Sequence, residues 1–204
     1  MLTVTKNKKQ RTSARIITLG AVLALTGGVY LLSLVSAPVI MPYVVANKID
    51  PKALASPRVS DNRIIIPKIG VDIPYGKDKA ALDAGAQWRY PERGSPEKGG
   101  NFIIAAHRFE LAVTPQATLA KSPFYHVDKL TIGDQIVIDY DGSRYGYEIT
   151  RIYDVKPAQV EIEAPSESAK LTLYTCSLGG SADGRVVVEA APLGEVKIDD
   201  GSSQ

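Results

Sequence analysis

The chain has 204 residues, and setting aside about 47 apolar or basic residues at the N-terminus and a polar tail of about 12 leaves roughly 145, the size of one globular domain. Hydrophobic residues make up 45% and charged residues 23%, which excludes two large domains and a chain disordered throughout. Of 24 basic residues, five precede residue 16, and the other 19 face 22 acidic ones, a net charge of −3. The chain after residue 15 is therefore slightly acidic, which argues against nucleic acid as a partner.

The first predicted element is a transmembrane helix over residues 16–37, which contain no charge and can cross a hydrocarbon core of about 30 Å. Because all the nearby cations precede it, residues 1–15 are expected in the cytoplasm and the remainder outside. A cleavable signal peptide is the main alternative, but its apolar part usually has only about 7 to 15 residues. A buried helix of a soluble domain is a further alternative. The flanking cations are Lys6, Lys8, Lys9, Arg11 and Arg15.

A membrane-proximal segment and linker is expected over residues 38–61, because the polar stretch before Arg63 holds two prolines and lacks periodicity. Short β-branched or alternating runs then predict strands. These runs cover residues 64–66, 71–74, 102–106, 135–140, 145–155, 171–176 and 186–190. Only short helices are expected, near 78–84 and 111–121. Seven or eight strands with few helices indicate an all-β barrel or sandwich.

Two features bound the later strands. Asp141-Gly142 lies between the runs 135–140 and 145–155, and Asp-Gly supplies the positive φ angles of a tight hairpin turn. After Pro192 the chain becomes polar and acidic, so residues 193–204 are expected to form a flexible tail. The folded domain is therefore expected over residues 62–192.

Cys176 is the single cysteine, so it cannot form an internal disulfide. One cysteine and two scattered histidines also cannot build a structural zinc site, and we predict no metal. Free cysteine is often a small buried hydrophobe, which is the structural alternative. An unpaired thiol outside the cell, however, is best explained by a function.

The runs 171–176 and 185–190 flank a loop of small residues and are expected to pair as an antiparallel hairpin. Cys176 and Arg185 then become cross-strand neighbours at roughly 5 Å. Alternation directs Leu171, Leu173, Val186 and Val188 to the core and places Cys176 and Arg185 together on the opposite face. There the guanidinium would favour a thiolate and stabilise an oxyanion.

His107 ends the apolar run 101–106 and is a candidate for proton transfer near neutral pH. The distance in sequence between the two residues does not by itself indicate that His107 lies beside Cys176. Taken singly, His107 would most often be a structural histidine and Arg185 a solvated charge. The second histidine, His126, is assigned a structural role.

Together these residues resemble a known family. Thr172-Leu173-Tyr174-Thr175-Cys176 resembles the TLxTC signature of sortases, the membrane-anchored cysteine transpeptidases of bacterial surfaces. Arg185 matches their catalytic arginine, and His107-Arg108 after Gly99-Gly100 resembles their GHR motif. The Pro123-Phe124, Leu130 and Gly133-Asp134 pattern is also similar, so the resemblance covers about residues 62–192. It implies a closed eight-stranded sortase-type β-barrel with short helices, preceded by the transmembrane helix.

The sequence also departs from the family pattern. Ala106 stands where glycine usually precedes the histidine, and Ser177-Leu178-Gly179-Gly180 follows the cysteine in place of proline or bulkier residues. The linker lacks the DPW-type lid of the pilin-polymerising class, so the chain is similar to classes D and E rather than to that class. No acidic loop cluster supports the calcium site of one branch.

The resemblance implies that Cys176, His107 and Arg185 are catalytic and that no cofactor is required. The implied reaction cleaves an LPxTG-like C-terminal sorting signal of secreted proteins through a thioester and transfers them to an amine acceptor at the cell surface. The implied location is a bacterial cell membrane, crossed once. The alternatives are a secreted cysteine hydrolase with water as acceptor and a non-catalytic membrane-tethered β-barrel binding module. An L,D-transpeptidase is disfavoured, because its His-Gly-containing motif is missing.

Overall fold

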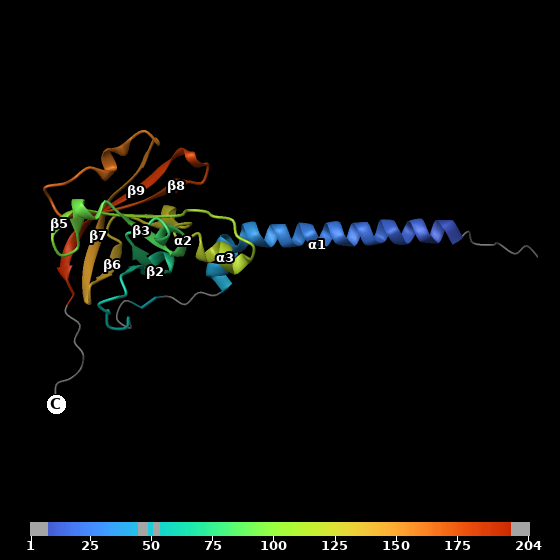
Figure 1. The fold of residues 1–204 in the computed structure, drawn as a ribbon, viewed down its shortest axis with the longest axis horizontal. Helices are drawn as coiled ribbons and strands as arrows, with labels where there is room; N and C mark the ends of the chain where they lie inside the picture. Colours follow the sequence, from blue (N-terminus) through green and yellow to red (C-terminus); the bar gives the residue numbers. More distant parts are fainter. Residues whose placement is uncertain (1–7, 45–48, 51–53, 197–204) are drawn as a thin grey trace, which may run out of the picture.

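The structure, a computed structural model, describes residues 8–44, 49–50 and 54–196. A long helix, α1 (Lys8–Val44), projects from one side of a β-barrel (Figure 1). Its segment Arg15–Ile40 has a mean hydropathy of 2.0 and is long enough to cross a membrane. The predicted span 16–37 lies within this segment. The helix nevertheless continues to Val44, into residues expected to be linker, because its C-terminal part packs against the barrel domain.

Within the described part of the chain, nine strands form one sheet. They are β1 (Arg63–Ile66), β2 (Val71–Gly76), β3 (Ala86–Arg89), β4 (Gly94–Ser95), β5 (Gly99–Ala106), β6 (Gln135–Tyr140), β7 (Ser143–Val155), β8 (Lys170–Ser177) and β9 (Gly180–Glu195). Their order is β3-β2-β1-β6-β7-β9-β8-β5-β4, and an additional pairing of β3 with β5 closes the ring. The two-residue β4 stays outside this ring. The predicted closed eight-stranded barrel is therefore confirmed.

The helices of the barrel domain are short. They are α2 (Ala81–Ala84), α3 (Pro115–Ala120) and the 3-10 turns η2 (Pro67–Ile69), η3 (Pro91–Arg93), η4 (Val127–Lys129) and η5 (Val160–Glu163). In α3, the Thr114 side chain caps the first turn by accepting from the Ala117 N–H, and Pro115 fits the first helical position. Both α-helices lie within their predicted ranges but are shorter.

The barrel interior is filled by aliphatic side chains of β1, β5, β6 and β8, such as Ile64, Ile104, Ile136 and Leu173, all at most 1% exposed. Trp88 packs edge to face against Phe102 with ring centroids 5.4 Å apart. The predicted β6–β7 hairpin is present, because Asp141 and Gly142 both have positive φ angles, 48° and 83°. The alternating strand pattern thus fixed which face of each strand points inward.

The strands β3 and β4 were not predicted from the sequence. β3 forms because Ala86 and Trp88 face the core while its backbone pairs with β5. At β4, a Cβ on Gly100 would lie 2.4 Å from the Arg93 carbonyl oxygen, so the double glycine allows this close approach.

The predicted tail begins too early. β9 continues through Glu195, since the residues after Pro192 pair with Tyr145 and Gly146 of β7. The hydrogen bond from the Val196 N–H to the Arg144 carbonyl, 2.7 Å long, extends this pairing. Residues 197–204 of the predicted tail lie outside the described residues.

Candidate active site

Cys176 and Arg185 are cross-strand partners in the β8–β9 hairpin, as the sequence predicted. Cys176 is a free, half-buried cysteine, and Arg185 is also half-buried. The antiparallel register places the two Cα atoms directly opposite each other, next to a register shift after Cys176. The hairpin therefore holds the two residues as neighbours through backbone pairing alone.

The side chains of β8 and β9 alternate between the core and the outer face as predicted. Leu171 and Leu173 face the barrel core, whereas Tyr174 belongs to a second hydrophobic cluster on the outer face. Val187 of β9 joins this outer cluster. Because side chains alternate, Cys176 and Arg185 share the outer face with Tyr174 and Val187.

His107 follows β5, which runs parallel to β8 with Ala105 level with Tyr174. The Thr175 hydroxyl donates to the Ala106 carbonyl oxygen at 2.7 Å, so the two strands remain in register up to their ends. Continuing the register by two residues, from Ala105 opposite Tyr174, places His107 level with Cys176 and on the same face. Since β8 lies between β9 and β5, Cys176 lies between Arg185 and His107.

The His107 imidazole is about a quarter exposed, and its Nε2 lies 3.5 Å from Oδ1 of Asp83 in α2. The His107 carbonyl oxygen accepts from the Phe124 N–H at 3.1 Å, which anchors the chain just after β5. The ring is therefore held at the strand end with one nitrogen near a carboxylate, an arrangement that orients an imidazole.

The outer face of β5, β8 and β9 is covered by the connection from β7 to β8, which contains η5. We call residues 156–169 the roof. Ile162 of the roof packs in the outer cluster with Ala105 and Tyr174. The Arg185 guanidinium donates to the carbonyl oxygen of Pro157 in the roof at 3.5 Å. The arginine is thereby fixed between β9 and the roof.

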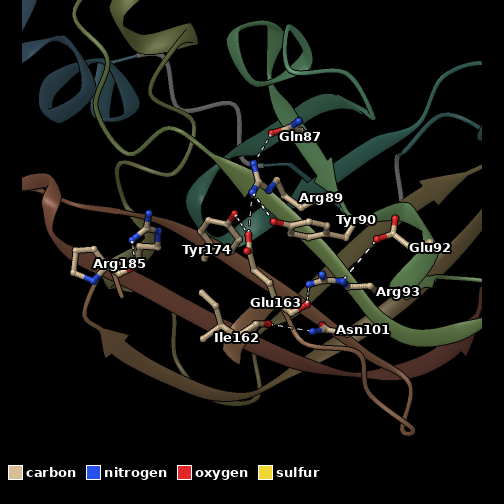
Figure 2. Close-up of polar contacts among 11 residues, drawn as sticks. Gln87, Arg89, Tyr90, Glu92, Arg93, Asn101, Ile162, Glu163, Tyr174 and Arg185 are labelled. Carbon is tan, nitrogen blue, oxygen red and sulfur yellow. Dashed lines mark hydrogen bonds and ion pairs between the residues drawn. The ribbon is translucent and has the colours of Figure 1, made fainter. Parts of the chain in front are cut away.

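Polar contacts hold the roof in place, as Figure 2 shows. The Tyr174 hydroxyl donates to Oε1 of Glu163 at 2.5 Å, and the Arg89 guanidinium lies 3.3 Å from the same oxygen. The buried Asn101 amide donates to the carbonyl oxygens of Ile162 and Ala164. Burial, together with the hydrogen bond to Glu163, raises the pKa of Tyr174, so its hydroxyl stays a donor.

This group of polar residues around Glu163 was not predicted, because no sequence motif indicates it. Its members come from β3, β5, β8 and the roof, and each is an ordinary polar residue in its own segment. Asn101 directly follows the double glycine and is fully buried. A polar residue at the start of an otherwise apolar run is the sequence feature that could have indicated this group.

A hollow of about 410 Å³ opens beside Arg185. Its lining includes Arg108, Lys156, Gln159, Ser177, Asp183 and Arg185. The lining thus includes the residues that directly follow His107 and Cys176. Arg108 is buried and pairs with Asp128 at 2.9 Å, and the Ser177 hydroxyl is 2.5 Å from Asp183 Oδ2. The hollow can receive a polar ligand beside Arg185.

His126, the second histidine, lies away from this site. His126 Nε2 is 2.8 Å from the Pro38 carbonyl oxygen of α1, a packing contact between helix and barrel domain. Burial lowers the pKa of His126, with a smaller contribution from Lys129. Across the described ranges, no group of three or more His, Cys, Asp or Glu residues is arranged to hold a metal ion.

Comparisons with known proteins show which family and fold the chain resembles. A family model described as the Sortase domain matches residues 64–193. Sortase SrtE1 of Streptomyces coelicolor is 29% identical over 140 residues, which are 60% of this chain and 37% of that protein. The chain therefore spans little more than a third of this curated relative.

Solved structures share the barrel. Sortase E1 of Streptomyces coelicolor, determined with a tripeptide in its active site, superposes with a TM-score of 0.55 at 23% identity, covering 68% of this chain and 94% of that one. The Sortase D5 transpeptidase of Clostridium perfringens gives a TM-score of 0.53 at 24% identity, covering 82% and 99%. At these identities the structures show the fold. With a family model that matches more than half of its length, the chain belongs to the sortase family.

Proposed function

We propose that this chain is a membrane-anchored cysteine transpeptidase with Cys176 as nucleophile, Arg185 as oxyanion donor and His107 as general acid and base. One observation carries the proposal: the adjacent strands β9, β8 and β5 bring Arg185, Cys176 and, just past the end of β5, His107 to one face, with Cys176 in the middle. Membership of a family of cell-surface transpeptidases supports it.

In the first step, the Cys176 sulfur attacks the carbonyl carbon of a Thr-Gly-type bond in an LPxTG-like sorting signal. Arg185 donates hydrogen bonds to the oxyanion of the tetrahedral intermediate. The C–N bond then breaks, and the departing amine takes its proton from His107, which leaves a thioester on Cys176.

In the second step, an amino group attacks the thioester carbonyl while His107 accepts its proton. The C–S bond breaks, the thiolate returns, and the secreted protein is joined to the acceptor by an amide bond. A cell-wall peptide or another surface protein supplies this amine. The protein side chains supply every proton and charge that these two steps need.

The anchor places this chemistry at the cell surface. Basic residues precede the apolar segment Arg15–Ile40, so we assign residues 1–15 to the cytoplasm and the barrel to the outside of a bacterial membrane. Secreted proteins with a sorting signal then meet the enzyme where they emerge.

The test incubates the full chain, in detergent micelles, with LPxTG-like and LAxTG-like peptides, with and without an added amine. We expect an amine-linked product that increases with the amine concentration and is lost in Cys176→Ala. Hydrolysis that the amine does not divert would identify the hydrolase alternative. Unchanged peptides with folded protein and an unreactive Cys176 would favour the binding module.

A further inference from the structure

The barrel domain packs alongside the C-terminal portion of the apolar part of α1. Leu34 and Ala37 are buried, and α1 packs against α3 in this region. The Tyr30 hydroxyl donates to the Val113 carbonyl oxygen. On the sides of the helix that face away from the domain, large apolar residues stay exposed. These residues are Leu31, Leu32, Val35, Val39 and Ile40. Part of the domain therefore lies level with a helix surface that is unsuited to water.

Val113 lies at this level through its bond to Tyr30, and it is the last residue of the segment 109–113, between His107-Arg108 and α3. The even-numbered residues of this segment are tied down: the Glu110 N–H donates to the Ser122 hydroxyl, and the Ala112 N–H to the Thr118 hydroxyl, both at 3.0 Å. Ser122 and Thr118 are buried. The segment is thus held at every second residue.

The odd-numbered residues of the same segment are apolar and exposed. Phe109 is 38% exposed, Leu111 53% and Val113 79%. The Phe109 ring packs edge to face against Tyr125, which adds a second aromatic residue to this edge. Such a dense exposed apolar edge marks an interaction surface. We call Phe109, Leu111 and Val113 the apolar edge.

The position of the apolar edge along α1 indicates its partner. With Arg15 at the inner boundary, a rise of about 1.5 Å per residue places Tyr30 about 23 Å along the axis, inside a hydrocarbon core of about 30 Å. The bond from Tyr30 to Val113 holds the apolar edge near this depth. Tyrosine and other aromatic residues are also characteristic of the membrane interface.

We propose that the apolar edge inserts into the outer leaflet of the membrane that α1 spans, as a second membrane contact of the enzyme. The inference depends on the proposed single-pass topology but on no catalytic step. Because the edge begins two residues after His107, this contact fixes the His107 side of the active site close to the membrane surface. Lipid, rather than a second protein, is the occupant, since the edge is continuous with the membrane-spanning helix.

The test reconstitutes the full chain in phosphatidylcholine vesicles, with or without bromine on the acyl chains, and measures tryptophan quenching. Val113→Trp and Leu111→Trp place a reporter on the apolar edge. Val22→Trp, on an exposed position within the span, is the positive control. Leu193→Trp is the matched negative control, because Leu193 is 57% exposed and the C-terminal end of β9 lies away from α1 (Figure 1). The native Trp88 is buried and contributes the same background to all variants.

We expect brominated lipid to quench Val113→Trp, Leu111→Trp and Val22→Trp, and to leave Leu193→Trp at the Trp88 background. Quenching of Val22→Trp alone would overturn the proposal and leave the anchor intact. Quenching of none would overturn the topology as well. Blue-shifted emission from Val113→Trp without quenching would mean that a protein covers the apolar edge, which also overturns the proposal. Transpeptidation is not measured, so these outcomes are independent of the proposed catalytic roles.

Discussion

Replacing Thr175 by valine removes one hydroxyl between the two strands that carry Cys176 and His107. This hydroxyl donates to the Ala106 carbonyl oxygen at 2.7 Å, and both residues are buried. Valine has nearly the same shape, so no cavity forms. Losing the bond and leaving a buried acceptor without this donor costs about 1–2 kcal/mol of the free energy of unfolding.

The same strand offers a matched control. The Thr172 hydroxyl donates to Oδ1 of Asn101 at 2.6 Å and is also buried. Thr172→Val should therefore cost a similar free energy of unfolding, about 1–2 kcal/mol. Thr172 lies four residues from Cys176, about 13 Å along the strand, whereas Thr175 is its direct neighbour.

We expect Thr175→Val to lower kcat/KM for transpeptidation about tenfold, because the register between Cys176 and His107 loosens and small misplacements of reacting groups are costly. Thr172→Val should stay within about twofold of the parent, since its effect is confined to stability. Urea unfolding followed by Trp88 fluorescence gives the stability, and peptide turnover gives kcat/KM. Equal losses of kcat/KM in both variants, or none in Thr175→Val, would refute the positioning argument.

Three further predictions concern other parts of the fold. Asp139→Asn should lower the free energy of unfolding by about 3 kcal/mol, because Asp139 and Arg144 form a buried ion pair at 2.7 Å; a loss below about 1 kcal/mol in urea unfolding would contradict this. Burial alone would raise the pKa of Asp134, but the hydrogen bonds from Lys68 and from the Thr131 N–H and hydroxyl together outweigh it and lower the pKa below its ordinary value of 3.8. Asp134 therefore stabilises the fold above that value, and the stabilisation is lost as pH falls through the lowered pKa. Unfolding measured from about pH 5 to 2 should show a shallower decline in Asp134→Asn, and an unchanged decline would contradict the assignment. Glu163→Ala should raise KM for the peptide more than it lowers kcat, because it releases the roof beside the hollow; an unchanged KM in steady-state turnover would count against that role.

Local patterns predicted much of this fold. Alternation and turn residues were sufficient for most strands and for the β6–β7 hairpin, since both depend on neighbours in sequence. The pairing of Cys176 with Arg185 was predictable for the same reason, because a hairpin makes the two residues neighbours. The end of α1 was not predicted, because packing against the barrel domain carries the helix past Pro38.

The elements that the sequence did not predict depend on contacts between distant segments. β3 forms against β5, and Glu163 meets Tyr174 and Arg89 only after the barrel closes. The place of His107 beside Cys176 likewise depends on the parallel pairing of β5 with β8, which spacing alone does not indicate. The catalytic roles of the three residues stay predictions.

The most direct measurement of the central claim is the intact mass of the full chain during turnover of a sorting-signal peptide without an acceptor amine. We expect an added mass equal to the peptide fragment up to the threonine, located on Cys176 by peptide mapping and removed by hydroxylamine. Arg185→Lys should form this adduct more slowly, since lysine lacks the planar fork that binds an oxyanion. Cleavage of the peptide by Cys176→Ala at the parental rate, with no adduct on the parent chain, would contradict the account.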